Sequence, residues 1–211
     1  MPEPRLPAES IDETRNPWTV LSKATAYENS WIRVDHHEVR NPKGGPGVYG
    51  VVHFKAHALG IVPIDELGHT ILVGQFRFPL GCYSWEIPQG GGKNGPPLLE
   101  SAQRELREEC GLAAKHWLPV LGMDLSNSVT DEQGTSFLAW ELGEVVAAPE
   151  DTELLQVARV PFWEAVDRVK HGAIRDLVSV ASLLRVALMA AQGELPEALS
   201  RLLRQPGAKS G

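Results

Sequence analysis

The 211-residue sequence has little cysteine, no long apolar run and a shortage of positive charge. Cys82 and Cys110 are its two cysteines, which are too few for a disulfide framework or a cluster of thiolate metal ligands. We therefore expect a reducing, cytoplasmic setting. No segment approaches the ~20 consecutive apolar residues that span a bilayer. Residues 1–10 contain no basic stretch followed by an apolar one, which argues against a secretory signal.

The shortage of positive charge limits the classes of partner. Lys and Arg number 20 against 27 Asp and Glu, which gives a formal net charge of -7. An acidic protein is a poor general binder of nucleic acid or of an anionic membrane, so we expect neither partner. A small anionic substrate stays possible if cations are recruited locally.

The composition is that of an ordinary folded protein, with 43% hydrophobic and 22% charged residues. Strand-like runs come first and helical ones are interspersed later, which favours an α+β fold or an α/β sandwich. We expect a flexible arm over residues 1–19, antiparallel strands over 20–55, a main domain over 56–195 and a C-terminal tail over 196–211.

Apolar periodicity predicts the individual elements. The best helix covers residues 98–110, with Gly111 at its C-terminal end and a loop rich in glycine and proline, 88–97, before it. Expected strands cover residues 30–40, 48–54, 58–64, 70–76, 118–125, 135–142 and 153–160. Further helices are expected over 162–171 and 177–192, the second with Leu183, Leu184, Val186, Ala187 and Leu188 facing a core.

Three glutamates share one side of the first predicted helix. Glu105 and Glu109 are four residues apart, and Glu108 lies beside them. One interpretation is a solvated face on which Arg104 and Arg107 act as counter-charges. The other is a cation site, because carboxylate oxygens suit hard cations such as Mg²⁺ or Mn²⁺. The glycine-rich loop that runs into the helix favours the second interpretation.

These residues resemble the Nudix box, G-x5-E-x7-R-E-U-x-E-E-x-G-U, in which U is a bulky apolar residue. One position departs from the pattern, because Pro96 stands where the box has its first glutamate. The matching positions are Gly90, Arg104, Glu105, Leu106, Glu108, Glu109, Gly111 and Leu112.

The flanking segments extend the resemblance to ADP-ribose pyrophosphatases and other nucleoside diphosphate sugar hydrolases of the Nudix family. Residues 75–81 and 85–90 are similar to the segment before the box in that subfamily, and residues 21–54 are similar to its small N-terminal sheet. The resemblance implies an α/β/α sandwich, the Nudix fold, with an N-terminal antiparallel sheet that forms a homodimer.

The resemblance also implies a metal site. Glu105 and Glu109 match the main carboxylate ligands, Glu108 an auxiliary one, and the backbone carbonyl of Gln89 a further ligand. The implied cofactor is Mg²⁺, with Mn²⁺ as a substitute. Bound cations would bridge phosphate oxygens and let an acidic protein approach a diphosphate. Arg104 would then orient the carboxylates.

The general base should come from a loop outside the box helix, over residues 149–153. Glu153 matches the family's position best and Glu150 is the alternative, while Glu108 stays a further catalytic candidate. Without the resemblance, this segment would be interpreted as an acidic surface loop.

Substrate recognition involves several implied residues. Trp31 and Tyr49 match aromatics that sandwich the base across the dimer, Arg77 matches a substrate-contacting arginine, and Glu86 matches a glutamate near the metals. The competing interpretations are that the two aromatics belong to a core or interface and that Arg77 and Glu86 form an ion pair.

Residues 126–132 depart from the family, because a polar turn replaces the usual loop of proline and glycine. Asn127 and Asp131 are candidates for hydrogen bonds to a sugar, and the alternative is a plain turn between strands.

Together these features imply metal-dependent hydrolysis of a nucleoside diphosphate sugar to a nucleoside monophosphate and a sugar phosphate, with ADP-ribose as the first substrate expected. One alternative is the same chemistry on GDP-mannose or another sugar nucleotide. A different class of alternative is a Nudix-fold module that binds a nucleotide without cleaving it.

The assignment of the base predicts the effect of one substitution. Glu153→Gln should lower turnover by ~10²-fold or more, because the amide cannot accept the proton of the attacking water. The measurement is steady-state hydrolysis, and an unchanged rate would move the role to Glu108 or Glu150.

Overall fold

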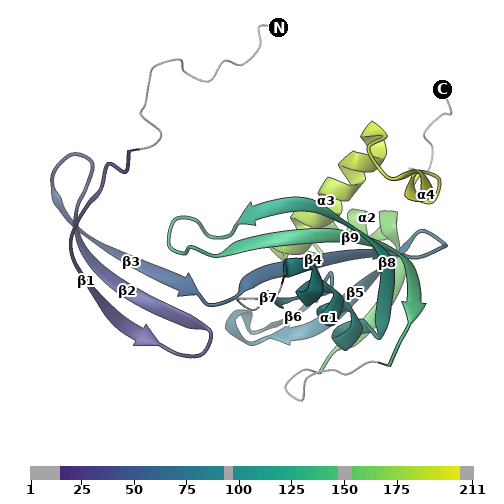
Figure 1. Ribbon diagram of the computed structural model, residues 1–211, viewed down its shortest axis with the longest axis horizontal. Helices are drawn as coiled ribbons and strands as arrows, with labels where there is room; N and C mark the ends of the chain where they lie inside the picture. The colour runs from purple at the N-terminus through teal and green to yellow at the C-terminus, as the bar shows by residue number, and fades with distance from the viewer. Residues whose placement is uncertain (1–14, 93–96, 147–153, 205–211) are drawn as a thin grey trace, which may run out of the picture. The chain divides into compact units, whose positions relative to one another are not determined.

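The computed structural model describes residues 15–92, 97–146 and 154–204. Its internal contacts divide the chain into two compact units, one ending at His53 and the other starting at Phe54. Figure 1 shows the secondary structure of both units. None of the described helices has the length and apolar character needed to cross a membrane.

The first unit contains an antiparallel sheet of three strands, β1 (Thr19–Glu28), β2 (Ile32–Arg40) and β3 (Pro46–Phe54), in that order. The expected sheet is confirmed. The turn between β2 and β3 is held by Asn41, whose Oδ1 accepts hydrogen bonds from the backbone N–H groups of Lys43 (2.9 Å) and Gly45 (3.1 Å). Such side-chain-to-backbone bonds are why asparagine is frequent in turns.

A buried carboxylate ties the sheet of the first unit together. Asp35 on β2 accepts from Lys23 Nζ at 2.7 Å, Thr25 Oγ1 at 2.8 Å and Arg33 Nε at 3.1 Å. His53 Nε2 on β3 lies 3.0 Å from the same carboxylate. The hydrogen bond from Lys23 is the largest cause that lowers the pKa of Asp35, so the carboxylate is ionised at neutral pH.

The second unit is built on a mixed sheet with the central order β10-β5-β4-β9-β8. Strands β4 and β9 run parallel, while the other neighbouring strands are antiparallel. The bounds are β4 His57–Ile64, β5 His69–Arg77, β8 Leu112–Asp124, β9 Gln133–Glu144 and β10 Gln156–Pro161.

Two short strands lie beside this central order. After the short 3-10 helix η1 (Phe78–Leu80), β6 (Cys82–Glu86) pairs with β5. Strand β7 (Gln89–Gly92) pairs with β4, and the expected loop over 88–97 is therefore wrong in its first half. Strand pairing uses backbone groups alone. A run of glycines has no alternating side chains, so the sequence pattern does not reveal that the segment is a strand.

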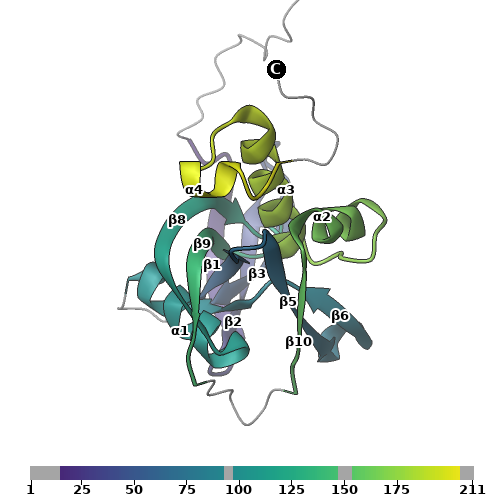
Figure 2. The same cartoon turned by 90° about the vertical axis from the view of Figure 1, so that its right-hand side faces the viewer.

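Helices cover both faces of the sheet (Figure 2). Helix α1 (Leu98–Cys110) lies on one face, and α2 (Phe162–Lys170) and α3 (Leu177–Gln192) lie on the other. The expected α/β/α sandwich is confirmed. These three helices have their predicted bounds or end within one residue of them. A short fourth helix, α4 (Glu197–Ser200), follows near the C-terminus.

The alternation of side chains along β4 separates the two apolar cores. Leu59 and Ile61 belong to the cluster beneath α1, whereas Val62 and Ile64 belong to the larger cluster beneath α2 and α3. Successive residues of a strand point to opposite faces, so a strand with both faces covered is apolar at nearly every position. The sequence of β4 shows this pattern.

Two expected core residues of α3 are exposed instead. Leu183 and Val186 are fully buried, but Leu184 and Leu188 are on the solvent side of the helix. These two leucines are four residues apart and therefore share a face, which turns away from the sheet. The expectation that both would face the core was wrong, because a run of apolar residues hides which face is buried.

The packed part of the chain continues beyond residue 195, the expected end of the main domain. Leu199 of α4 and Leu203 after it are both buried in the larger core. Trp163 Nε1 donates to the carbonyl of Leu203 at 3.2 Å, which fixes this segment against α2.

This packing predicts different effects of truncating two adjacent leucines. Leu203 is 1% exposed, and Leu203→Ala should cost ~2–5 kcal/mol of unfolding free energy through lost burial and a cavity. Leu202 is 37% exposed, and Leu202→Ala should cost less than ~1 kcal/mol. Denaturant unfolding measures both, and equal costs would mean that this segment does not pack as described.

Candidate active site

Helix α1 places two carboxylates on its buried side. Glu105 is 9% exposed and Glu109 is 8% exposed, next to the fully buried Ala102 and Leu106 that anchor the helix to the sheet. The helix ends at Gly111, whose left-handed φ of 64° allows its N–H to return to the last turn. Charged groups this buried need compensation from nearby donors or a cation.

Strand β7 approaches α1 so closely that a side chain at one glycine position would collide with Glu105. A Cβ atom on Gly90 would lie 2.0 Å from Cδ of Glu105 and 2.3 Å from its Oε1. The carboxylate of Glu105 therefore occupies the space in which any other residue would carry its side chain. The first glycine of the box is explained by this contact.

Arg104 compensates two of the three glutamates. Its guanidinium forms ion pairs with Glu105 and with Glu108, and it also donates to the carbonyl of Gly91 at 3.4 Å. Burial alone would lower the pKa of Arg104, but the two carboxylates outweigh it and raise the pKa above its usual value. The structure thus places Arg104 where it can orient both carboxylates.

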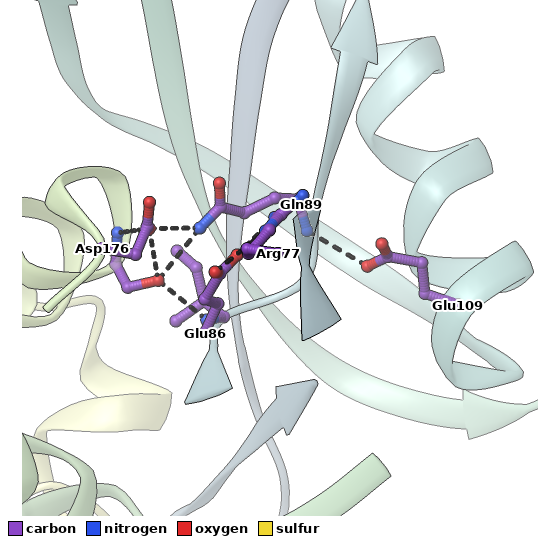
Figure 3. Close-up of polar contacts among 7 residues, drawn as sticks. Arg77, Glu86, Gln89, Glu109 and Asp176 are labelled. Atoms are coloured by element: carbon purple, nitrogen blue, oxygen red, sulfur yellow. Dashed lines mark hydrogen bonds and ion pairs between the residues drawn. The ribbon is translucent and has the colours of Figure 1, made fainter. Parts of the chain in front are cut away.

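Glu109 is held from the other side by the backbone of Gln89. The N–H of Gln89 donates to Oε2 of Glu109 at 3.1 Å, across the gap between β7 and α1 (Figure 3). Both residues line a hollow of about 260 Å³ that also includes Arg77, Gly90 and Glu132. Two of the expected metal ligands, Gln89 and Glu109, therefore lie with Arg77 around this hollow, and a further one, Glu105, lies directly behind Gly90.

Arg77 forms an ion pair with the buried Glu86 beside this hollow. Nε of Arg77 donates to Oε1 of Glu86 at 3.0 Å, and a second bond joins NH2 to Oε2. The hydrogen bond to Glu86 is the main cause that raises the pKa of Arg77, with smaller contributions from Asp176 and Glu109. A second hollow, of about 500 Å³, lies next to Arg77, Glu86, Arg175 and Asp176, so Arg77 borders both hollows.

The donor set fits a hard divalent cation. Its members are carboxylate and carbonyl oxygens, which such cations prefer, and two of the three carboxylates, those of Glu105 and Glu108, share the guanidinium of Arg104. Among the described residues, no three His, Cys, Asp or Glu side chains already surround one point suited to a metal. Arg104 pairs with Glu105 and Glu108, and a bound cation would take over part of that compensation.

The remaining predicted residues come from other parts of the chain. Trp31 is in the turn before β2 and not on the strand, and it is 74% exposed. Tyr49 on β3 contacts Trp18 edge to face, with ring centroids 5.4 Å apart. Both belong to the first unit. Pro96, Glu150 and Glu153 lie outside the described residues.

The turn between β8 and β9 forms as expected and contains the two predicted sugar contacts. Asn127 is exposed, and Oδ1 of Asp131 accepts from the backbone N–H of Phe54 at 3.1 Å. The neighbouring Glu132 lines the hollow, and burial raises the pKa of its carboxyl. Glu132 was missed, although its place next to Asp131 in the same loop was a usable signal.

Comparison with known proteins agrees with this site. Residues 55–179 match the NUDIX domain, and residues 18–52 match the nucleoside diphosphate sugar hydrolase N-terminal domain. An ADP-ribose pyrophosphatase from Mycobacterium tuberculosis is 34% identical over 172 residues, which cover 79% of this chain and 81% of that protein. An ADP-sugar pyrophosphatase from Mus musculus is 28% identical over 177 residues, covering 76% and 81%.

The fold comparison agrees with the architecture described above. The crystal structure of an ADP compounds hydrolase superposes with a TM-score of 0.75 at 22% identity, covering 84% of this chain and 97% of that one. The chain therefore belongs to the Nudix hydrolase family, whose members generally require a divalent metal, and the predicted resemblance and enzyme class are confirmed.

The close contact between β7 and α1 predicts the effect of adding one methyl group. Gly90→Ala should cost ~1–3 kcal/mol of unfolding free energy, because Glu105 or the strand has to move. Gly143→Ala on β9 is the control, since a Cβ there meets no atom within 4 Å. Chemical denaturation measures both, and equal stability of the two variants would contradict the described contact.

Proposed function

We propose that this chain hydrolyses the diphosphate of a nucleoside diphosphate sugar, with ADP-ribose as its first substrate and Mg²⁺ as its cofactor. The observation that carries the proposal is the pair of almost buried carboxylates, Glu105 and Glu109, beside a hollow that Arg77 also lines. The named activities of the Mycobacterium tuberculosis and Mus musculus relatives support the choice of substrate class.

The proposed mechanism assigns a task to each residue of the site. Glu105, Glu109 and the carbonyl of Gln89 would hold Mg²⁺, with Glu108 as an auxiliary ligand. When bound, the cation offsets the charge of the diphosphate and acidifies a water molecule. Arg77 presents its guanidinium to phosphate oxygens, for which its forked geometry is suited. Its pair with Glu86 keeps that guanidinium in place.

The reaction is an ordinary hydrolysis of an anhydride. The oxygen of water forms a bond to one phosphorus atom, and the bridging P–O bond breaks. A carboxylate, Glu153 in our proposal and Glu150 or Glu108 as alternatives, accepts the proton of the water. The products are a nucleoside monophosphate and a sugar phosphate.

Recognition of the substrate and the assembly are further parts of the proposal. Trp31 and Tyr49 stack on the base in a homodimer formed through the N-terminal sheet, and Asn127 and Asp131 contact the sugar. The exposure of Trp31 supports a role in binding, because an indole that is 74% exposed buries little of its apolar surface within a single chain. Two free cysteines agree with action in the cytoplasm.

A second substrate, GDP-mannose or another sugar nucleotide, is favoured by one observation. The polar turn between β8 and β9 differs from the loop expected for ADP-ribose enzymes, and Glu132 from this turn lines the hollow. A nucleotide-binding module without catalysis is disfavoured, because Glu105, Glu108 and Glu109 are all present.

Product analysis tests the proposal. The protein is incubated with Mg²⁺ and a panel of sugar nucleotides, dinucleoside polyphosphates and nucleoside triphosphates. We expect cleavage of ADP-ribose or another sugar nucleotide, and a loss of ~10²-fold or more in Glu109→Gln, since metal-held charge stabilisation contributes several kcal/mol. Glu100→Gln is the control, because it removes the same charge from an exposed position of the same helix.

Two outcomes would contradict the proposed function. Absence of cleavage across the whole panel, with Glu109→Gln binding nucleotides as well as wild type, would indicate a binding module. Preferential cleavage of nucleoside triphosphates would leave the chemistry in place but overturn the substrate class.

A further inference from the structure

The first turn of α3 contains a hydroxyl group with every hydrogen-bonding position used. Ser179 Oγ accepts from the backbone N–H of Ile87 at 3.0 Å and from Nε2 of Gln89 at 3.0 Å, and it donates to Oδ2 of Asp176 at 2.8 Å. A serine hydroxyl has one donor and two acceptor sites, so the group is saturated. Ser179 is fully buried, and two of its partners come from the segment that leads into the Nudix box.

Asp176 binds the same segment through one oxygen atom. Its Oδ2 accepts from the backbone N–H of Ser179 at 2.8 Å, which is the usual N-cap bond of α3. The same oxygen accepts from Nε2 of Gln89. The cap of α3 is therefore also the anchor of a glutamine that lies 87 positions earlier in the sequence.

Gln89 is consequently held at both ends. Its side chain is fixed to α3 by Asp176 and Ser179, and its backbone N–H is fixed to Glu109 of α1 at 3.1 Å. Figure 3 shows Gln89 between Asp176 on one side and Glu109 on the other. Its backbone also pairs with Gly60 of β4, which completes the restraint.

We propose that Asp176 and Ser179 are positioning residues, which hold the Gln89 carbonyl and the Glu109 carboxylate in the arrangement that binds the divalent metal. This inference rests on the proposed function, in which both groups are metal ligands. It assigns to α3, on the opposite face of the sheet from α1, a part in building the metal site that acts through Gln89. Partners that orient ligands in this way typically change metal affinity by ~10- to 100-fold when removed.

A buried serine one turn further along α3 provides a matched control. Ser182 is fully buried like Ser179, and its Oγ has no hydrogen-bond partner among the described residues. Ser182→Ala therefore removes an identical atom from the same helix without breaking a bond. Any effect that Ser179→Ala shows and Ser182→Ala does not comes from the contacts to Ile87, Gln89 and Asp176.

The experiment measures binding of Mn²⁺ in the absence of substrate, by calorimetry and by electron paramagnetic resonance. We expect Ser179→Ala and Gln89→Met to weaken binding by ~10-fold, and Ser182→Ala to stay within ~2-fold of wild type. Circular dichroism and thermal unfolding without metal show whether each variant is folded.

Substitution of Asp176 separates positioning from a merely structural role. Asp176→Asn keeps an oxygen that accepts the same three hydrogen bonds and is an equally good helix cap, so Mn²⁺ affinity should stay close to that of wild type. Asp176→Ala removes the acceptor and should weaken binding by ~10-fold. If Ser179→Ala fails to fold, the difference in Mn²⁺ affinity between Asp176→Asn and Asp176→Ala still tests the positioning role.

The outcomes distinguish this inference from the proposed function. Folded Ser179→Ala, Gln89→Met and Asp176→Ala variants with wild-type Mn²⁺ affinity would overturn the positioning role, whatever the enzyme hydrolyses. Failure of wild type to bind Mn²⁺ would overturn it as well. If wild type binds Mn²⁺ and the variants weaken it, but no sugar nucleotide is cleaved, the positioning role stands and the proposed substrate class fails.

Discussion

The second unit depends on one electrostatic constraint, the near-burial of Glu105 and Glu109 on a single helix face. Removing a carboxylate from water costs several kcal/mol unless donors or a cation compensate it. Arg104 supplies that compensation for Glu105, and the backbone N–H of Gln89 supplies it for Glu109. The geometry of β7 follows from this need, because Gly90 has to leave space for the first carboxylate and Gln89 has to present its backbone to the second.

The layered architecture gives these carboxylates a rigid support. Alternating residues of β4 enter both apolar cores, so movement of the strand would disturb the packing beneath α1 and beneath α3 together. Strand β7 is paired to β4, and Gln89 at its start contacts both helices. The site is thus assembled from an α1 face, a short glycine strand and the first turn of α3.

Some parts of this arrangement can be predicted from the sequence alone. Helix α1 was predicted with its exact bounds, because its apolar spacing and Gly111 are local signals. The Nudix box pattern brought Glu105, Glu109 and Gln89 together in the prediction, and the structure places them around one hollow or directly behind it. The roles assigned to these residues stay predictions, as does the role of Glu153.

Other parts were not accessible to local patterns. Strand β7 was interpreted as a loop, because glycines carry no side chains whose alternation reveals pairing. The contact of Gln89 with Asp176 joins positions 87 residues apart, and each residue has an ordinary local explanation, a loop glutamine and a helix cap. Leu184 and Leu188 were assigned to the core because α3 is apolar on more than one face. Long-range packing decided each of these cases.

The central claim is that Glu105 and Glu109 are buried in order to bind a divalent cation, and thermal unfolding with and without metal tests it most directly. A cation at 100 times its Kd stabilises the folded state by ~2.7 kcal/mol, which corresponds to a rise in Tm of roughly 5–10 °C for a chain of this size. We expect this rise with Mg²⁺ or Mn²⁺ in wild type, its reversal by a chelator, and its absence in the Glu105→Gln, Glu109→Gln double variant. An unchanged Tm in wild type over the whole range of metal concentrations would contradict the account.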